Sequence, residues 1–151
     1  MLHQLKRQQI VPATLQEVWA FFSNPRNLNE ITPPDLRFEI IFGGEETMYQ
    51  GQIMAYKIQL LPLIHTRWLT EITQVKEPFY FADRQQLGPY SFWLHEHFFT
   101  PVPDGVEMRD RVTYQLPLGP IGDLVHRFWV GPRLQSIFNY RAEKVKQIFA
   151  A

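Results

Sequence analysis

The sequence contains no cysteine. Disulfide bonds, thiolate nucleophiles and cysteine-based zinc or iron–sulfur sites are therefore excluded, so packing has to stabilise the fold. Net charge is absent too, because 15 basic residues balance 15 acidic ones. A chain without net charge has no long-range attraction to phosphate backbones, and we expect no nucleic-acid partner.

Long hydrophobic runs are also missing. No apolar stretch approaches the roughly 18 residues needed to cross a bilayer, so we expect no transmembrane segment. Lys6 and Arg7 lie inside an alternating pattern rather than ahead of an apolar stretch, which is unlike a secretory signal. The sequence has no glycine-rich phosphate loop, no Gly-X-Ser-X-Gly elbow and no His-Glu-X-X-His helix. We predict a cytoplasmic protein and no cofactor.

Aromatic residues, by contrast, are abundant: 12 Phe, 6 Tyr and 4 Trp make up 15% of the chain. These large side chains supply much of the volume of a hydrophobic core. A length of 151 residues is usual for one domain, and no repeat or linker interrupts the sequence. We therefore predict a single domain over residues 1–151.

Hydrophobic spacing and turn residues predict mainly strands. Leu2–Val11 alternates and ends before proline; Thr14 and Glu17 then form a capping box for a first helix, and Arg26–Ile31 predicts a second, short one. Six further strands are expected at Leu36–Phe42, Gln52–Leu61, His65–Val75, Phe79–Gln86, Ser91–Pro101 and Val106–Leu116. The turns between them are Gly43-Gly44, Pro62, Glu77-Pro78, Gly88-Pro89 and Asp104-Gly105. Consecutive hairpins of this kind form an antiparallel meander.

The C-terminal part predicts the longest helix. It is expected to begin at Asp123, to break or kink at Gly131-Pro132 and to resume to Ala150. The stripe expected to face the sheet consists of Leu134, Ile137, Phe138, Arg141, Val145 and Ile148. Five basic residues, Arg127, Arg133, Arg141, Lys144 and Lys146, accompany one acid, Glu143. Such a pattern is typical of a solvated face, with contact to a membrane surface as the alternative.

This order of elements, together with local motifs, resembles a known family. The motifs are Val11-Pro12-Ala13 to Trp19-Ala20-Phe21-Phe22, Trp68 to Ile72, Phe81-Ala82-Asp83, Gly88-Pro89-Tyr90, Trp93 to His97, Asp110 to Tyr114, and Leu116 to Gly119. They are similar to the SRPBCC superfamily of START-type lipid carriers, birch-pollen-allergen-like proteins and polyketide cyclases, and within it to a bacterial cell-division-inhibitor-like subgroup. The resemblance implies an α+β helix-grip fold, in which a curved seven-stranded antiparallel sheet wraps a long C-terminal helix.

Strand alternation predicts where the polar residues of the last two strands point. On the final strand Asp110 shares a face with apolar residues, so this face is expected inward. On the preceding strand we favour the face of His95 and His97 as inward. These three side chains should then converge with Asp83, and with Tyr114 at one end. Hydrogen bonds between histidine and aspartate would compensate their burial and raise the imidazole pKa values.

Four interpretations of this cluster are open. It is a buried polar network that fixes strand register, a set of groups that orient a ligand, a general acid/base pair, or a His-X-His metal site with an aspartate as third ligand. Nothing else in the sequence supplies a distinctive metal-ligand spacing, and we predict no metal. His65, beside a turn, is expected in solvent. The candidate catalytic residues are His95, His97 and Asp110.

The aromatic residues Trp19, Phe38, Trp68, Phe81, Trp93, Phe128 and Phe138 are expected either to fill the core or to line a cavity. Arg141 interrupts the apolar helix stripe, and it is expected either to extend outward or to meet an acidic ligand group. The predicted ligand-binding residues are Trp68, Phe81, Asp83, Trp93, His95, His97, Met108, Asp110, Tyr114, Leu134, Ile137, Phe138 and Arg141.

The leading functional prediction is a non-enzymatic module that binds a hydrophobic small molecule, such as a lipid, a polyketide-like compound or an isoprenoid, between the sheet and the last helix. The alternatives are a cofactor-independent cyclase, dehydratase or hydrolase that uses a His/Asp pair in the same cavity, and a protein-interaction role for the exposed helix. The sequence leaves the ligand and the oligomeric state open.

Overall fold

The computed structural model describes residues 1–61 and 63–150. A single antiparallel sheet of seven strands, in the order β1-β7-β6-β5-β4-β3-β2, forms one layer. The strands are β1 (His3–Val11), β2 (Glu39–Phe42), β3 (Ile53–Leu61), β4 (Ile64–Lys76), β5 (Tyr80–Leu87), β6 (Phe92–Val102) and β7 (Gly105–Gln115). The meander predicted from the turn residues is therefore confirmed, and the first strand pairs with the last. The predicted turn at Pro62 lies outside the described residues.

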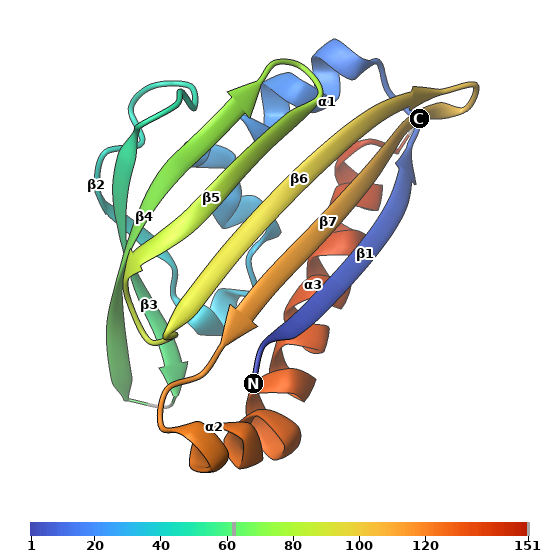
Figure 1. Ribbon diagram of the computed structural model, residues 1–151. Helices are drawn as coiled ribbons and strands as arrows, with labels where there is room; N and C mark the ends of the chain where they lie inside the picture. Colours follow the sequence, from blue (N-terminus) through green and yellow to red (C-terminus); the bar gives the residue numbers. More distant parts are fainter. Residues whose placement is uncertain (62, 151) are drawn as a thin grey trace.

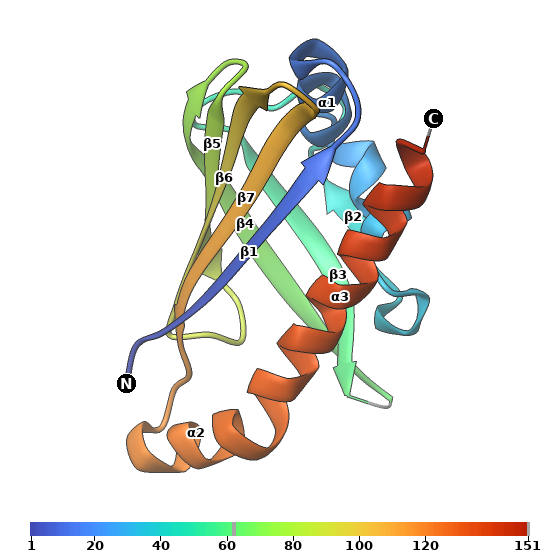
Figure 2. The same ribbon diagram turned by 90° about the vertical axis from the view of Figure 1, so that its right-hand side faces the viewer.

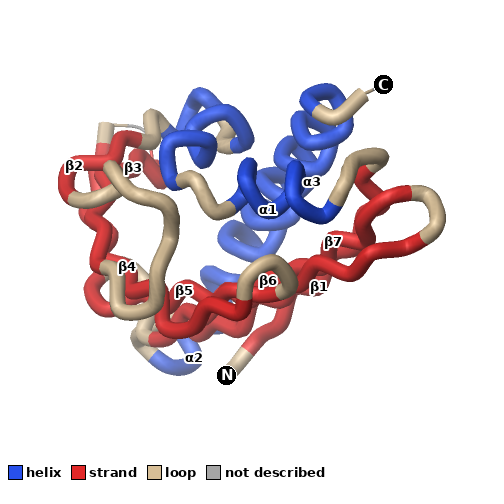
Figure 3. Tube along the Cα trace, turned by 90° about the horizontal axis from the view of Figure 1, so that it is seen from above, coloured by secondary structure: helices blue, strands red, loops and turns tan. Residues whose placement is uncertain are grey.

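The sheet is strongly curved, and the N-terminal helices and the long C-terminal helix lie on its concave side (Figure 3). Pairing of β4 with β5 shifts register between Leu69 and Thr70 and again between Ile72 and Gln74. Such bulges bend a strand and increase its twist. They lie in the middle of the sheet, where the curvature brings β2 and β3 round toward the C-terminal helix (Figure 1).

The first helix, α1 (Leu15–Phe22), begins as the sequence predicts. The Thr14 side chain accepts a hydrogen bond from the Glu17 backbone N–H, and the Thr14 backbone N–H donates to the Glu17 carboxylate at 2.8 Å. Two 3-10 helices follow, η1 (Pro25–Ile31) and η2 (Pro34–Leu36). The predicted second helix is thus a 3-10 helix, and the predicted strand from Leu36 begins only at Glu39 because η2 occupies its start.

The C-terminal helical segment is longer and more continuous than predicted. It comprises α2 (Gly119–Val125), the π-helical turn η3 (His126–Val130) and α3 (Gly131–Ile148), and it crosses the open side of the sheet (Figure 2). The segment bends near Gly131-Pro132, as a predicted kink requires, but its helical structure continues without a break (Figure 2). Pro132 lacks a backbone N–H and crowds the preceding turn. The chain accommodates it by widening to a π turn, in which the Gly131 N–H donates to the His126 carbonyl.

Two hydrophobic clusters hold these layers together. One joins Trp19 and Phe22 of α1 to Phe81 and Phe99 of the sheet, with Trp19 meeting both sheet rings edge-on. The other packs Leu134 and Phe138 of α3 against strand residues that include Trp93. The predicted helix stripe faces the sheet at Leu134, Phe138 and Val145, but Ile148 at its end is 38% exposed. None of the described helices is long and apolar enough to span a bilayer.

Candidate functional site

A pocket of about 470 Å³ lies between the concave face of the sheet and α3. Its walls are mainly apolar and aromatic, from η1, β3, β4, β6 and the C-terminal helices. All of the predicted ligand-binding residues line it except Met108, Asp110 and Tyr114. A volume in this range suits a small organic ligand, for which pockets measure roughly 300–1,000 Å³.

The three exceptions have other positions. Met108 packs in the core cluster around Trp19. Asp110 lies behind the wall, where it contacts His95, His97 and Arg141. Tyr114 is hydrogen-bonded to His126 at 2.6 Å, so it attaches the C-terminal helical segment to β7. Phe128, expected in the core or in a cavity wall, is 71% exposed, because the π turn leaves it on the outer side of the helix.

Several lining residues were missed by sequence reasoning. Loop and 3-10 residues contribute Leu28, Ile31 and Leu36, and β3 contributes Tyr56 and Ile58. The alternation of β3 could have indicated Tyr56 and Ile58, because they share a face with Met54, which is fully buried. No local pattern marks the residues of η1 and η2 as pocket wall, since their position depends on how the chain crosses the sheet.

A buried polar cluster interrupts the apolar wall. His95 and His97 point inward from β6, as alternation predicts, and are 6% and 3% exposed. His95 Nε2 lies 2.8 Å from Asp110 Oδ1, and His97 Nε2 lies 3.0 Å from Asp83 Oδ2. The two imidazole rings stack with centroids 3.8 Å apart. The structure therefore brings together the four polar residues that the sequence placed on converging faces.

Arg141, from α3, is the fifth residue of the cluster. Its guanidinium donates to Asp110 Oδ1 at 3.5 Å, and its side chain is 11% exposed. It lies over the rings of Phe22 and Phe138, at 5.4 Å and 5.9 Å from their centroids. Arg141 thus does not extend outward: it pairs with an aspartate of the same chain and lines the pocket, and its Nε makes no hydrogen bond within the described residues.

The two histidines have opposite pKa shifts although they are neighbours. Burial lowers the pKa of His95, the charge of His97 adds to this effect, and the hydrogen bond to Asp110 does not offset them. Burial also lowers the pKa of His97, but its contacts with Asp110 and Asp83 outweigh burial, so that the pKa is raised. Aspartate thus raises the pKa of both imidazoles, as expected, but for His95 burial and the charge of His97 outweigh it, because His95 has one carboxylate partner where His97 lies between two.

The carboxylates remain ionised despite their burial. Burial raises the pKa of Asp110, but Arg141 and the hydrogen bonds with the histidines hold it well below its usual value. Burial likewise raises the pKa of Asp83, and the hydrogen bond with His97 lowers it again to below its usual value. With His97 protonated and His95 neutral, two carboxylates balance one imidazolium and one guanidinium. The cluster then has no net charge.

One acceptor of this cluster is open to the pocket. Asp83 lines the pocket with 22% of its side chain accessible, and its Oδ1 makes no hydrogen bond within residues 1–61 and 63–150. Tyr56 lines the same pocket, and burial raises the pKa of its hydroxyl, with the charge of Asp83 adding to the effect. A ligand group that donates a hydrogen bond would find its partner at Asp83.

Metal ligation has a geometric basis in this cluster. Asp83, His95 and His97 each offer one ligand atom, and these atoms lie within 4.8 Å of one another. The aspartate of the set is Asp83. His97 bonds to Asp83 and lies 3.3 Å from Asp110 through its other nitrogen, an arrangement that suits an imidazolium. A metal ion would have to replace this proton.

A curved antiparallel sheet that encloses a long C-terminal helix, with a pocket between them, defines the helix-grip class of α+β fold. A START superfamily protein from Mycobacterium smegmatis matches the chain with a TM-score of 0.70 and 13% identity, over 97% of this chain and 99% of that one. A norcoclaurine synthase from Thalictrum flavum, solved as a point mutant with a transition state analogue, matches with a TM-score of 0.67 and 13% identity, over 97% and 96%. Protein CV1439 from Chromobacterium violaceum matches with a TM-score of 0.73 and 8% identity, over 98% of both chains.

These structures confirm the predicted helix-grip fold, which this chain shares with a START superfamily protein. No family model matches the sequence, and no curated protein matches it. The resemblance to the cell-division-inhibitor-like subgroup stays a prediction. At identities of 8–13% the similarity carries the architecture alone, so the function has to be argued from the pocket.

Proposed function

We propose that the protein binds a neutral, largely apolar small molecule in the pocket between sheet and α3, with one hydrogen-bond donor of the ligand, such as a hydroxyl group, placed against Asp83. The lipid, isoprenoid and polyketide-like compounds expected from the sequence include molecules of this kind. The whole chain would act as one binding domain in the cytoplasm. The observation that carries the proposal is the apolar pocket of about 470 Å³ with one accessible carboxylate in its wall.

The apolar wall supplies the affinity. Each buried CH₂ group contributes about 0.8 kcal/mol, so a chain of about ten such groups gains enough to offset the costs of association. The polar cluster supplies the orientation. Because its charges balance internally, a charged ligand would disturb it, while a neutral donor to Asp83 satisfies the acceptor that the protein leaves open.

Displacement of the neutral fluorophore N-phenyl-1-naphthylamine tests the proposal. 1-Dodecanol and dodecane have the same chain length and differ in one hydroxyl group. A hydrogen bond to a buried carboxylate contributes about 1.5–3 kcal/mol, so we expect the alcohol to bind at least about tenfold more tightly than the alkane. Asp83→Asn should reduce this preference, and Glu71→Gln on the neighbouring strand, which does not line the pocket, should leave it unchanged.

A second set of variants tests the location. Replacing Ile58 and Ile137 by Trp fills the pocket from both walls, and Ile41→Trp places the same bulk at a surface position. We expect the filled variant to lose fluorophore binding and the surface variant to retain it. Equal binding by both variants, with folding intact, would show that the fluorophore binds elsewhere and would overturn the proposal.

Catalysis is a second candidate, and one observation favours it. His95 lines the pocket with its Nε2 against Asp110, and its Nδ1 makes no hydrogen bond within the described part of the chain. Its lowered pKa keeps it neutral near pH 7, so Nδ1 presents a lone pair to a bound molecule. Once a ligand is known, His95→Gln should abolish its turnover and preserve its binding if the protein is a cyclase, dehydratase or hydrolase. Unchanged conversion by this variant would exclude the role.

A further inference from the structure

The surface where the pocket opens is apolar. Three of the residues that line the pocket are largely open to solvent: Ile64 at 53%, Val125 at 42% and Trp129 at 54%. Ile64 begins β4 beside the β3–β4 turn, while Val125 and Trp129 belong to α2 and η3. Both elements lie at the same end of the molecule in two perpendicular views (Figures 1 and 2). This end is therefore the mouth of the pocket.

More apolar side chains extend the mouth on both sides. On the helical side, Ile121, Leu124 and Phe128 are 64%, 58% and 71% exposed, and on the hairpin side Leu63 is 94% exposed. Ile121, Leu124 and Phe128 recur at intervals of three and four residues, so one helical stripe points to solvent instead of to the core. We call Leu63, Ile64, Ile121, Leu124, Phe128 and Trp129 the mouth surface. Exposed apolar side chains gathered at one end of a molecule are typical of contact sites.

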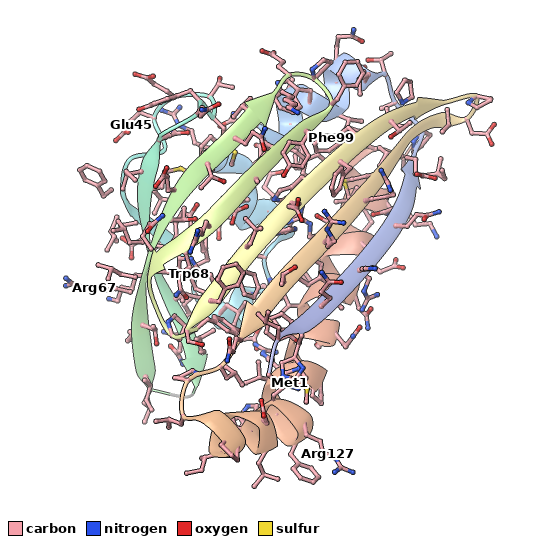
Figure 4. All side chains as sticks on the ribbon, viewed as in Figure 1. Met1, Glu45, Arg67, Trp68, Phe99 and Arg127 are labelled. Carbon is pink, nitrogen blue, oxygen red and sulfur yellow. The ribbon has the colours of Figure 1, made fainter. Side chains whose placement is uncertain are left out.

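The charges beside the mouth surface suit insertion into a bilayer surface. Residues 118–130 carry one acidic and one basic residue, Asp123 and Arg127. Arg127 projects away from the molecule at this end (Figure 4), and its guanidinium lies 5.4 Å from the centre of the Phe128 ring. An arginine beside exposed Phe and Trp can keep its charge at the headgroups while the rings enter the acyl boundary.

We propose that the mouth surface docks the protein on a phospholipid bilayer and opens the pocket directly into it. Ile64 and Trp129 line the pocket and are also exposed, so an apolar molecule moving between bilayer and pocket stays in contact with apolar groups throughout. Asp123 pairs with the N-terminal ammonium at 3.2 Å and does not offset Arg127, so residues 118–130 offer the bilayer one cationic side chain and depend mainly on apolar insertion. Binding therefore needs no anionic lipid and responds weakly to salt.

Trp129 provides an intrinsic probe of docking. Trp19 and Trp93 are buried, at 5% and 8% exposure, and Trp68 is half-buried, so Trp129 is the one tryptophan largely in solvent. Phosphatidylcholine vesicles should shift the tryptophan emission of the full-length protein to shorter wavelength, and the protein should float with them. Vesicles that contain phosphatidylglycerol should bind it to a similar extent.

The variants separate docking from pocket binding. Ile121, Leu124 and Phe128 do not line the pocket, so replacing all three by Gln should weaken vesicle binding by at least about tenfold and preserve N-phenyl-1-naphthylamine binding. The matched control, Phe42→Gln with Phe79→Gln, removes exposed rings away from the mouth and should bind vesicles as the wild type does. Because the vesicles contain no pocket ligand, docking can fail while the proposed pocket function holds.

Three results would overturn the proposal. The first is that the wild-type protein remains in solution with vesicles of either composition. The second is that the triple variant and the control bind vesicles equally well. The third is that the wild type does not float and that sedimentation velocity without lipid shows a dimer, which the triple variant abolishes. The mouth surface would then be an interface between two copies of the chain.

Discussion

The replacement Asp110→Asn tests the energetic role of the polar cluster. Asp110 is 4% exposed, and its carboxylate is the shared partner of His95 at 2.8 Å and Arg141 at 3.5 Å, with the second nitrogen of His97 at 3.3 Å. Asparagine has almost the same shape and lacks the charge. The variant therefore leaves the guanidinium of Arg141 and the imidazolium of His97 in the wall with Asp83 as the remaining carboxylate.

Breaking a buried ion pair by removing one partner costs about 3–5 kcal/mol, because the other charge stays buried without compensation. His97 can lower this cost by releasing its proton, and the Asn carbonyl can still accept one hydrogen bond. We therefore expect the free energy of unfolding to fall by about 2–4 kcal/mol at pH 7. For a chain of this size, about 1 kcal/mol corresponds to roughly 2–4 °C in Tm, so Tm should fall by roughly 4–16 °C.

Urea denaturation followed by tryptophan fluorescence measures this change. Glu107→Gln is the matched control, because it removes a carboxylate from the same strand at a position where the partner, Arg109, is 48% exposed. Such surface pairs contribute little, and we expect a loss below about 0.5 kcal/mol. If Asp110→Asn lowers the free energy of unfolding by no more than the control does, Asp110 does not compensate the buried charges of Arg141 and His97.

The remaining predictions concern pH, the first helix and the attachment of the C-terminal segment. In a histidine NMR titration His97 should titrate above pH 6.5 and His95 below it; the reverse order would contradict the geometry. The stability from His97 is full below pH 6.5 and is lost as the pH rises through its raised pKa. The stability from Asp83 and Asp110 is lost as the pH falls below 3.8, and urea denaturation across pH should show both effects. Thr14→Ala should cost about 1 kcal/mol in unfolding free energy by loss of the helix cap, and a loss below about 0.3 kcal/mol would show that the cap is replaced by water. Tyr114→Phe removes the hydrogen bond to His126; hydrogen exchange should become faster in α2 and η3 but not in β7, and equal acceleration in both would refute the role of Tyr114 as an attachment point.

The fold could be predicted from the sequence because local signals agree with it. Turn residues such as Asp104-Gly105 separate strands of alternating pattern, and Thr14 and Glu17 mark a helix start. The inward direction of His95, His97 and Asp110 follows from the same alternation. Each of these predictions depends on residues that are close in sequence.

The parts that failed depend on contacts between distant segments. The pairing of Arg141 with Asp110 joins α3 to β7, and no sequence pattern specifies it. The opposite pKa shifts of His95 and His97 arise from the number of carboxylates around each ring. A kink at Gly131-Pro132 could be predicted from the proline, but the π turn that keeps the helix continuous there could not.

Native mass spectrometry of the protein as purified shows whether the pocket between sheet and α3 holds an apolar ligand. The wild type, the Ile58→Trp/Ile137→Trp variant and the Ile41→Trp control are expressed and purified in parallel, and bound molecules are extracted with organic solvent. We expect one apolar molecule per chain to be bound to the wild type and to the control, and none to be bound to the filled variant. The same adduct on all three proteins would contradict it, as would a wild type that neither carries an apolar molecule nor binds N-phenyl-1-naphthylamine.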